Sequence, residues 1–372
     1  MAILPRTIFQ SPKIASQLEK LRTQFDVPLL GASTGPHFKG AVVGTRKIGT
    51  NVNATMNDIY SIGSNGKAMT CTVIAILVEE GVLSWQTKLG DVLRDYPMLD
   101  VYRNVTVELL TSHRSGITDY AAEVDAFFAP LINDTAPVGR VKMAKETLSK
   151  PTNGTQGIWN YSNMNYVLAG LIIDILTGKP AEDAFQSRLF KPLGMSSAGF
   201  GPTPQSSITA IDNPWGHIQT DSGPVAVGDG EENKYRDLPS SINTAGLVHM
   251  KIQDWNKFLT AHLRATQGHT TKSLKLSLRG FEKLHTSAPG PEPEEFPGYG
   301  YTYGGFARGE DTSKPGNYIL THCGSNDRNF ACQDTITANG TIYMSFTNIG
   351  PPIGDTASQA VLSNLRNGTI VL

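Results

Sequence analysis

The two ends of the chain share a strand-like pattern that the middle lacks. Over residues 27–48, glycines separate short apolar runs such as Gly40-Ala-Val-Val-Gly44, which predicts an antiparallel hairpin. Strand-like runs return only towards the other end, at residues 300–304, 318–321 and 340–347. Because a strand needs a neighbour to satisfy its backbone groups, both ends are expected to form one antiparallel sheet.

Helical spacing dominates between these ends and also flanks them. Helices are expected over residues 14–26, 67–80, 166–176, 181–190, 247–265 and 356–365. Residues 196–240 are instead rich in Gly, Pro, Ser and Asp, and are expected to form a long, lid-like loop.

We therefore predict the α/β (α+β) class: an antiparallel sheet built from both chain termini and flanked by helices, with an inserted, mostly helical lobe. Residues 1–70 and 241–372 are assigned to the sheet domain. Residues 71–240 are assigned to the mostly helical domain, with its lid-like loop at 196–240. A chain of 372 residues is long enough for such a two-lobed enzyme.

Charge and composition exclude several classes of protein. The 32 Lys and Arg residues nearly balance 33 Asp and Glu, so the chain has no general attraction to phosphate, and no nucleic-acid partner is expected. Three cysteines do not make a disulfide framework in a chain of this length. The longest apolar stretch, residues 73–78, is far too short for a membrane span. The first residues do not resemble a signal peptide, so a cytoplasmic protein is expected.

The sharpest local feature is Ser64-Asn-Gly-Lys67, at the entrance of the apolar helix expected over 67–80. Side chains three residues apart share one helix face, so the Lys67 amine can take the proton of the Ser64 hydroxyl. The Ser64 N–H lies at the positive end of the helix, which favours a developing oxyanion. On its own, the pattern also fits a serine N-cap followed by a surface lysine.

Two further segments carry suitable polar groups. Trp159-Asn-Tyr161-Ser-Asn163 precedes the helix expected over 166–176; its phenol can relay protons and its amide can hold a substrate carbonyl. Thr321-His-Cys-Gly-Ser-Asn326 ends a predicted strand whose backbone can complete an oxyanion hole. Without catalysis, Tyr161 would simply be an aromatic residue that caps the helix.

Ser-x-x-Lys, Tyr-x-Asn and His-x-Gly in this order resemble the motifs of the serine β-lactamase and penicillin-binding-protein family. The chain is most similar to the class C-related esterases, D-amino-acid peptidases and transesterases of that family. Leu109-Leu-Thr-Ser-His-Arg-Ser-Gly116 and Tyr161-Ser-Asn-Met-Asn-Tyr-Val-Leu-Ala-Gly170 also resemble family segments, and the similarity extends from about residue 27 to 350. The resemblance implies a β-lactamase/transpeptidase-like fold.

The resemblance also implies a role for each motif residue. Ser64 matches the acylated nucleophile, Lys67 its activating partner and Tyr161 the proton-relay tyrosine. The oxyanion hole is expected from the N–H groups of Ser64 and Ser325. Substrate contacts are expected from Asn163, His322, Gly324 and Asn326. No metal and no cofactor is implied.

These roles predict a serine hydrolase that cleaves an ester or amide through a Ser64 acyl-enzyme, with esterase-like activity as the first expectation. His322 stands where true β-lactamases usually have a lysine, and a histidine is only fractionally charged near neutral pH, so efficient β-lactam hydrolysis is not expected. The alternatives are an acyltransferase or transesterase in small-molecule biosynthesis, a true β-lactamase and a non-catalytic binding protein. The expected partner is a small-molecule ester, amide or lactam.

Several further histidines, Cys323 and a run of aromatic residues are expected mainly to have structural roles. Six other histidines are scattered without metal-ligand spacing: His113, His217, His249, His262, His269 and His285. Cys323 is expected to point into the core and not to act as a nucleophile. The aromatic residues Tyr299, Tyr301, Tyr303 and Phe306 alternate as in a strand and fit either the cleft or the core.

Overall fold

The computed structural model describes residues 12–119, 127–152, 154–228, 238–293, 297–311, 317–325, 330–338 and 340–371. Its main sheet has seven strands in the order β2-β1-β12-β11-β10-β9-β8, and every neighbouring pair is antiparallel. These strands are β1 (Leu29–Gly35), β2 (Lys39–Gly44), β8 (Tyr299–Tyr301), β9 (Ala307–Glu310), β10 (Tyr318–Ser325), β11 (Ala331–Thr337) and β12 (Thr341–Thr347).

The pairing of β1 with β12 joins the two ends of the chain. In this pair Gly31 lies opposite Phe346. A Cβ atom on Gly31 would lie 2.1 Å from the Phe346 ring, so only glycine lets the ring lie flat on the strand. The predicted fold class, with one sheet built from both ends, is confirmed. The sequence pattern had not indicated β9 or β11.

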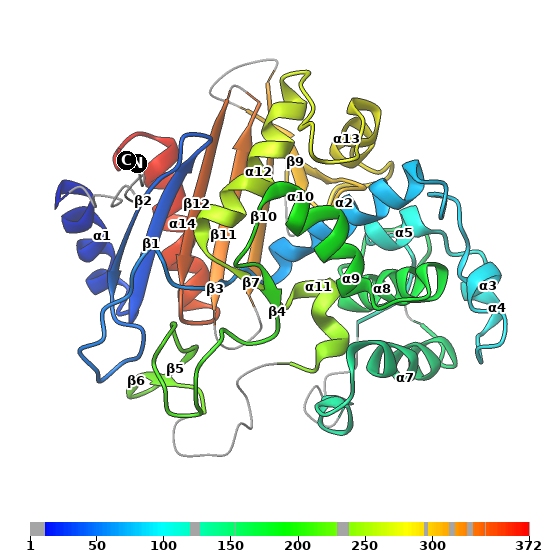
Figure 1. Ribbon diagram of the computed structural model, residues 1–372, viewed down its shortest axis with the longest axis horizontal. Coiled ribbons are helices and arrows are strands. Elements are labelled where there is room, and N and C mark those ends of the chain that lie inside the picture. The colour runs from blue at the N-terminus through cyan, green and yellow to red at the C-terminus, as the bar shows by residue number, and fades with distance from the viewer. Residues whose placement is uncertain are drawn as a thin grey trace, which may run out of the picture.

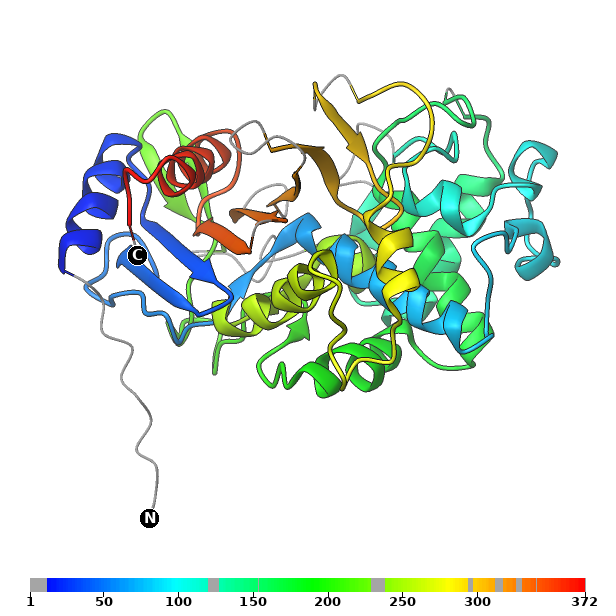
Figure 2. The same cartoon turned by 90° about the horizontal axis from the view of Figure 1, so that it is seen from above.

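Helices cover both faces of this sheet (Figure 1; Figure 2). The first and last helices, α1 (Pro12–Gln24) and α14 (Ile353–Arg366), lie side by side on one face, where they enclose a small apolar core with β1. On the other face, α12 (Ile252–Thr266) crosses β1, β11 and β12. Next to it, α2 (Gly66–Glu79) is buried along most of its length and connects the sheet to the helical lobe.

The helical lobe is built around α8 (Asn163–Thr177), which the sequence predicts from its apolar spacing and its end at Gly178. Gly178 has a φ of +67°, the left-handed conformation that favours glycine at a helix end. The other helices are α3 (Leu89–Val92), α4 (Asp100–Arg103), α5 (Val107–Thr111), α7 (Ala136–Leu148), α9 (Ala181–Phe185), α10 (Lys191–Leu193), α11 (Asn243–Gly246) and α13 (Leu278–His285). Shorter turns are η1 (Gly63–Asn65), η2 (Ala129–Leu131), η3 (Gln186–Phe190) and η4 (Ser240–Ile242).

Two local predictions are wrong. The helix expected over 247–265 begins only at Ile252, because the preceding residues form strand β7 (Val248–Met250). β7 lies between β3 (Tyr60–Ser61) and β4 (Gly199–Phe200) in a small second sheet, so its backbone is paired on both sides, and all three of its residues are buried. The segment 196–240 is not simply a loop: it contains β4 and a hairpin of β5 (His217–Thr220) and β6 (Gly223–Ala226), while residues 229–237 lie outside the described residues.

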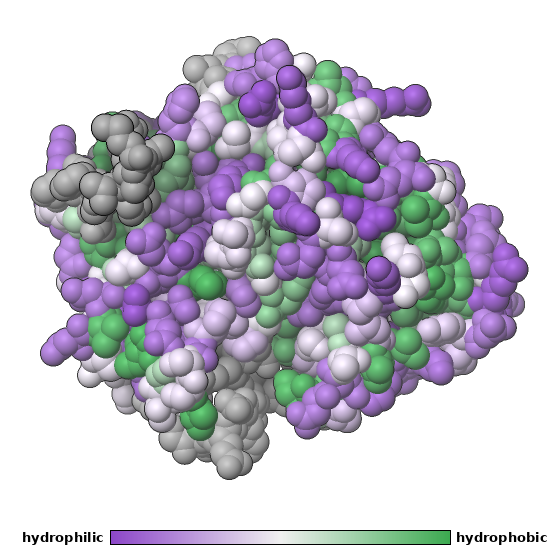
Figure 3. Space-filling model, viewed as in Figure 1, coloured by the Kyte–Doolittle hydropathy of each residue, from purple (hydrophilic) through white to green (hydrophobic). Residues whose placement is uncertain are grey.

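The division into two domains stays a prediction. Helix α2 crosses the proposed boundary at residue 70, and one continuous apolar core contains residues from both proposed units. The surface seen in Figure 3 is mostly hydrophilic, with hydrophobic residues in small groups. Within the described part of the chain, no helix combines the length and apolar character that a membrane span needs.

Candidate active site

Ser64 lies in the tight turn η1, directly before the buried helix α2. One turn later on the same face, the Lys67 side chain is fully buried, and its Nζ lies 2.9 Å from Ser64 Oγ. An apolar helix holds the lysine away from water at this position, because 12 of its 14 residues are buried. The surface-lysine interpretation of this motif is therefore wrong.

Lys67 Nζ also donates to two oxygens that can only accept. These are Asn163 Oδ1, at 2.7 Å, and the backbone oxygen of Ala245, also at 2.7 Å. When Lys67 is in the ammonium form, its three N–H bonds point to these two oxygens and to Ser64 Oγ. In the neutral form, the two carbonyl oxygens keep the two N–H bonds, so the lone pair faces the Ser64 hydroxyl. This arrangement is suited to proton transfer from Ser64 to Lys67.

Tyr161 approaches Ser64 from the helical lobe. Its hydroxyl donates to Ser64 Oγ at 2.8 Å, and Lys67 Nζ lies 4.8 Å from the centre of its ring. Both contacts place the phenol where it can pass a proton between Ser64 and a departing group. The structure thus brings Ser64, Lys67 and Tyr161 together from two distant segments of the chain; their catalytic roles remain predictions.

His113 supports Tyr161 and was missed by the sequence reasoning, which treated it as one of the scattered histidines. Its ring lies 4.4 Å from the Tyr161 ring, centre to centre, and its Nδ1 accepts the N–H of Ser162 at 3.1 Å. Burial, and then the nearby charge of Lys67, hold the pKa of His113 well below its usual value. The ring is therefore a neutral support. The signal was present, because His113 belongs to the family-like segment 109–116.

Asn163 contacts Lys67 rather than pointing into open space. Its Nδ2 donates to Asp119 Oδ2 at 2.9 Å, and its backbone N–H donates to Asp119 Oδ1 at 3.1 Å. Since its Oδ1 already accepts from Lys67, the expected contact with a substrate amide stays a prediction. Asp119 was also missed; it lies three residues beyond the family-like segment 109–116, and a lone aspartate in a loop carries no pattern.

The end of β10 presses against the turn that carries Ser64. A Cβ atom on Gly324 would lie 2.2 Å from Ile62 O and 3.0 Å from Ser64 N, and one on Gly63 would lie 2.5 Å from Ser325 N. The two glycines therefore let the Ser64 and Ser325 backbones meet, as two oxyanion donors must. Asn326, the last residue of the third motif, lies outside the described residues.

His322 is buried, and both of its ring nitrogens are occupied. Nδ1 donates to the backbone oxygen of Cys323, which can only accept. Nε2 therefore accepts, and the Tyr301 hydroxyl donates to it at 3.1 Å. Burial, and then the charge of Lys67, lower the pKa of His322 to about 3. The side chain is neutral at pH 7, so the expectation of a fractional charge is wrong, because that expectation used the value for a solvated histidine.

Burial decides the interpretation of Cys323 and of two of the aromatic residues. Cys323 is exposed on the opposite face of β10, so the expectation that its thiol points into the core is wrong. Strand alternation is the reason, because His322 and Gly324 occupy the buried face. Among the aromatic residues, Tyr301 and Phe306 are fully buried, and Tyr301 contacts the site through His322.

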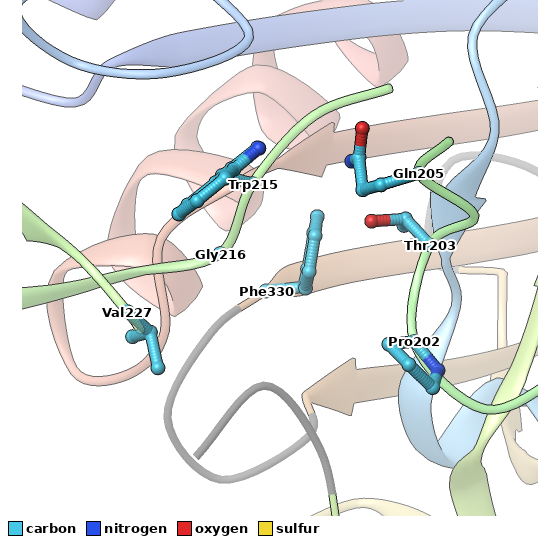
Figure 4. A pocket seen from close by; sticks show the side chains of 7 residues that line it. All are labelled: Pro202, Thr203, Gln205, Trp215, Gly216, Val227 and Phe330. Carbon is cyan, nitrogen blue, oxygen red and sulfur yellow. The ribbon is translucent and has the colours of Figure 1, made fainter. Parts of the chain in front are cut away.

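A narrow pocket opens beside the same end of the sheet (Figure 4). Its lining residues are Pro202, Thr203, Gln205, Trp215, Gly216, Val227 and Phe330. Phe330 precedes Ala331, which pairs with Ser325, so this wall lies near the expected oxyanion hole. All the other lining residues come from the segment 196–240, and Trp215 and Phe330 give the pocket two aromatic walls.

Comparisons with known proteins show related sequences. The chain is 29% identical to penicillin-binding protein 4 of Amycolatopsis lactamdurans over 257 residues, 66% of this chain and 62% of that protein. It is 27% identical to an unguisins hydrolase of Aspergillus campestris over 58% of this chain and 40% of that protein. The matches thus span less than two thirds of either relative.

Solved structures show the same fold. The octameric penicillin-binding protein homologue from Pyrococcus abyssi superposes with a TM-score of 0.75 at 22% identity, covering 95% of this chain and 77% of that one. A D-stereospecific amidohydrolase from Streptomyces sp. gives 0.73 at 22% identity, covering 96% and 99%. The family model described as Beta-lactamase matches residues 33–361, which confirms the resemblance seen in the motifs. The chain belongs to the Beta-lactamase family.

Proposed function

We propose that the protein is a serine hydrolase that cleaves an ester or amide bond through an acyl-enzyme on Ser64, and that uncharged esters are its preferred substrates. The observation that carries this proposal is the position of Ser64 Oγ, 2.9 Å from Lys67 Nζ and 2.8 Å from the Tyr161 hydroxyl. A serine hydroxyl is a weak nucleophile unless a neighbouring group takes its proton, and two such groups contact it here.

In the acylation step, Ser64 Oγ forms a bond to the substrate carbonyl carbon while its proton moves to Lys67 Nζ. The carbonyl oxygen becomes an oxyanion that the Ser64 and Ser325 N–H groups stabilise. The bond to the leaving alcohol or amine then breaks, and the proton returns through Tyr161 to that leaving group. In the second step a water molecule attacks the acyl carbon and gives a proton to Tyr161. The proton passes back through Lys67 to Ser64 Oγ as the bond between Oγ and the acyl carbon breaks.

The neutral state of His322 supports the preference for uncharged substrates. A carboxylate on the substrate would need a cation at this strand, and His322 is instead uncharged and has no free ring nitrogen. Burying an unpaired carboxylate costs several kcal/mol.

Labelling with a fluorophosphonate tests this proposal. We expect one adduct, located on Ser64 by mass spectrometry of the digested protein. Parallel assays with p-nitrophenyl esters of increasing chain length, D-amino-acid amides and nitrocefin should show highest turnover for the neutral esters. Product analysis with a competing alcohol measures any acyl transfer. Absence of both labelling and turnover in folded protein would favour the non-catalytic binding protein instead.

Replacing Tyr161 by phenylalanine should lower kcat for ester hydrolysis about 10²-fold, because the hydroxyl that contacts Ser64 is lost while the ring still packs on His113. Steady-state kinetics and thermal unfolding check this together. Tyr102→Phe is a suitable control, since the Tyr102 hydroxyl donates to the Lys150 backbone oxygen, far from the site in the helical lobe. Equal kcat in the parent and in Tyr161→Phe would remove the phenol from the proton path.

Replacing His322 by glutamine should leave the pH profile of kcat/KM unchanged in shape between pH 5 and 8. The histidine is already neutral over this range, because its pKa is about 3, and glutamine is also neutral. If kcat/KM of the parent changes with pH near 6.5 and that of the variant does not, then His322 titrates during catalysis and a charged third motif takes part.

A further inference from the structure

Asp119 accepts two hydrogen bonds from Asn163, the residue whose amide oxygen in turn accepts from Lys67. We propose that Asp119 is a positioning residue: its carboxylate fixes the orientation of the Asn163 amide, and thereby keeps the Lys67 lone pair directed at Ser64. This inference rests on the proposed acyl-enzyme function and assigns to that function a residue that its three motifs do not contain.

The orientation follows from what each group can donate. An ionised carboxylate only accepts, so the Asn163 atom 2.9 Å from Asp119 Oδ2 must be the NH2 group. The amide oxygen must then face the other way, where it accepts from Lys67 Nζ at 2.7 Å. A rotated amide would present its NH2 group to the lysine. A neutral lysine could satisfy that donor only with its lone pair, which would then no longer be available to Ser64.

Other groups near Lys67 do not by themselves fix this choice: the Ala245 backbone oxygen, two tyrosine rings and two buried imidazoles. The Ala245 backbone oxygen holds one N–H bond of the amine but leaves the remaining positions open to rotation. The Tyr161 and Tyr166 rings lie 4.8 and 5.4 Å from Nζ, and a π face does not select one orientation of the Asn163 amide. Near the lysine, the neutral imidazoles of His113 and His322 bring no charge that could replace the carboxylate.

Asp119 has a second, purely structural contact that the test must separate. It accepts the backbone N–H of Asn163, the first residue of α8, and so satisfies one free donor at the start of this helix. Asp119→Asn separates the two roles. The oxygen of the substituted side chain can still accept the backbone N–H, but its NH2 group then meets the NH2 group of Asn163, which must turn to avoid it.

Exchanging Asp119 and Asn163 should restore the matched donors and acceptors between these two side chains and Lys67. In the double variant Asp119→Asn/Asn163→Asp, the new carboxylate at position 163 accepts both from the new amide at position 119 and from Lys67. The oxygen of that new amide still accepts the backbone N–H at position 163, so all donors are again paired. The negative charge is now directly against Lys67 and favours its ammonium form, so activity should recover only at higher pH than in the parent.

The experiment measures the rate constant of Ser64 labelling by a fluorophosphonate from pH 5 to 10 in the parent, both single variants and the double variant. We expect Asp119→Asn to be about 10²-fold slower at every pH. The double variant should return to within about tenfold of the parent, with its acid limb displaced to higher pH. The rate constant is taken from labelled molecules alone, so partial unfolding changes the amplitude and not the result.

Ser277→Ala provides the matched control. Ser277 caps α13 by accepting the Gly280 N–H and its own hydroxyl donates to Glu79, so its loss should lower the unfolding temperature and leave labelling unchanged. Labelling of Asp119→Asn within threefold of the parent would overturn the inference, as would a double variant no faster than Asp119→Asn. A parent that is not labelled at all would instead reject the proposed function.

Discussion

Replacing Ser64 by alanine is expected to abolish covalent labelling and to lower kcat/KM for ester hydrolysis by about 10⁴-fold or more. The loss should be this large because Lys67 and Tyr161 act only through the Ser64 oxygen, and groups that act as a unit fail together when one is removed. Steady-state kinetics with a p-nitrophenyl ester and intact-mass analysis after fluorophosphonate treatment measure the two effects.

Ser222→Ala is the matched control for this experiment, because Ser222 lies exposed in the turn between β5 and β6. It should keep the parent rate and the parent adduct. Retention of more than a hundredth of the parent activity in Ser64→Ala would show that another residue is the nucleophile. Melting temperatures of both variants should stay near that of the parent, since the Ser64 side chain is only half-buried.

Acid should destabilise this protein strongly, because the fold buries an unusual set of neutral histidines. Burial is the first cause of a lowered pKa at each of them: His113, His217, His249, His262, His285 and His322. The pKa values of three are about 4 (His217), about 3 (His285) and about 3 (His322). Their hydrogen bonds show why protonation is resisted.

His262 and His285 form one such buried pair. The Thr72 hydroxyl donates to Ala68 O, so its oxygen accepts from His262 Nε2, at 3.2 Å. His262 Nδ1 must then accept from His285 Nε2, at 2.9 Å. A proton added to His262 Nδ1 would break this contact and place a charge in the core between α2, α12 and α13.

The direction of the pH effect follows from proton uptake. The unfolded chain binds protons at these histidines below a pH of about 6.5, and the folded chain does so only at much lower pH. Stability is therefore fully present above pH 6.5 and falls as the pH decreases. At about 1.4 kcal/mol per unit, each histidine loses about 2 kcal/mol between pH 6.5 and 5.

Asp334 opposes this trend in part. Burial raises its pKa to about 8, so the folded chain binds its proton more readily than the unfolded chain, and stability rises as the pH falls towards 4. Its contribution offsets that of one histidine. For the three histidines with stated values, the net loss from pH 6.5 to 5 is about 4 kcal/mol, a large share of a typical folding free energy.

Urea unfolding between pH 8 and 5 measures this loss as a falling midpoint. His217→Gln removes one titrating group while keeping a donor and an acceptor for Asn348 O and the Ile48 N–H. The variant should lose about 2 kcal/mol less than the parent between pH 6.5 and 5. If the free energy of unfolding falls equally with decreasing pH in the two proteins, His217 is not among the groups that cause acid unfolding.

Much of the fold could be read from local patterns. The hairpin of β1 and β2, the buried helices α2 and α8 and the terminal helix α14 all follow from spacing and from glycines at their ends. The sequence pattern did not predict strand β11, because apolar and polar residues alternate only weakly along it. The polar Asp334 shares the inner face with Cys332 and Ile336. Strand β7 was not predicted because Val248, His249 and Met250 lie just before a helix and resemble its first turn, and only pairing with β3 and β4 distinguishes them.

The sequence alone determined the order and identity of the motifs, because Ser64 and Lys67 lie one helical turn apart and need no distant contact to share a face. Only the tertiary structure decided what surrounds them. Asp119 and His113 reach the site because the segment that follows α5 packs against Tyr161 and Asn163. The charge of His322 was likewise decided by burial, because a pKa depends on the solvent and the charges around a group, and neither is written in the spacing of residues along a chain.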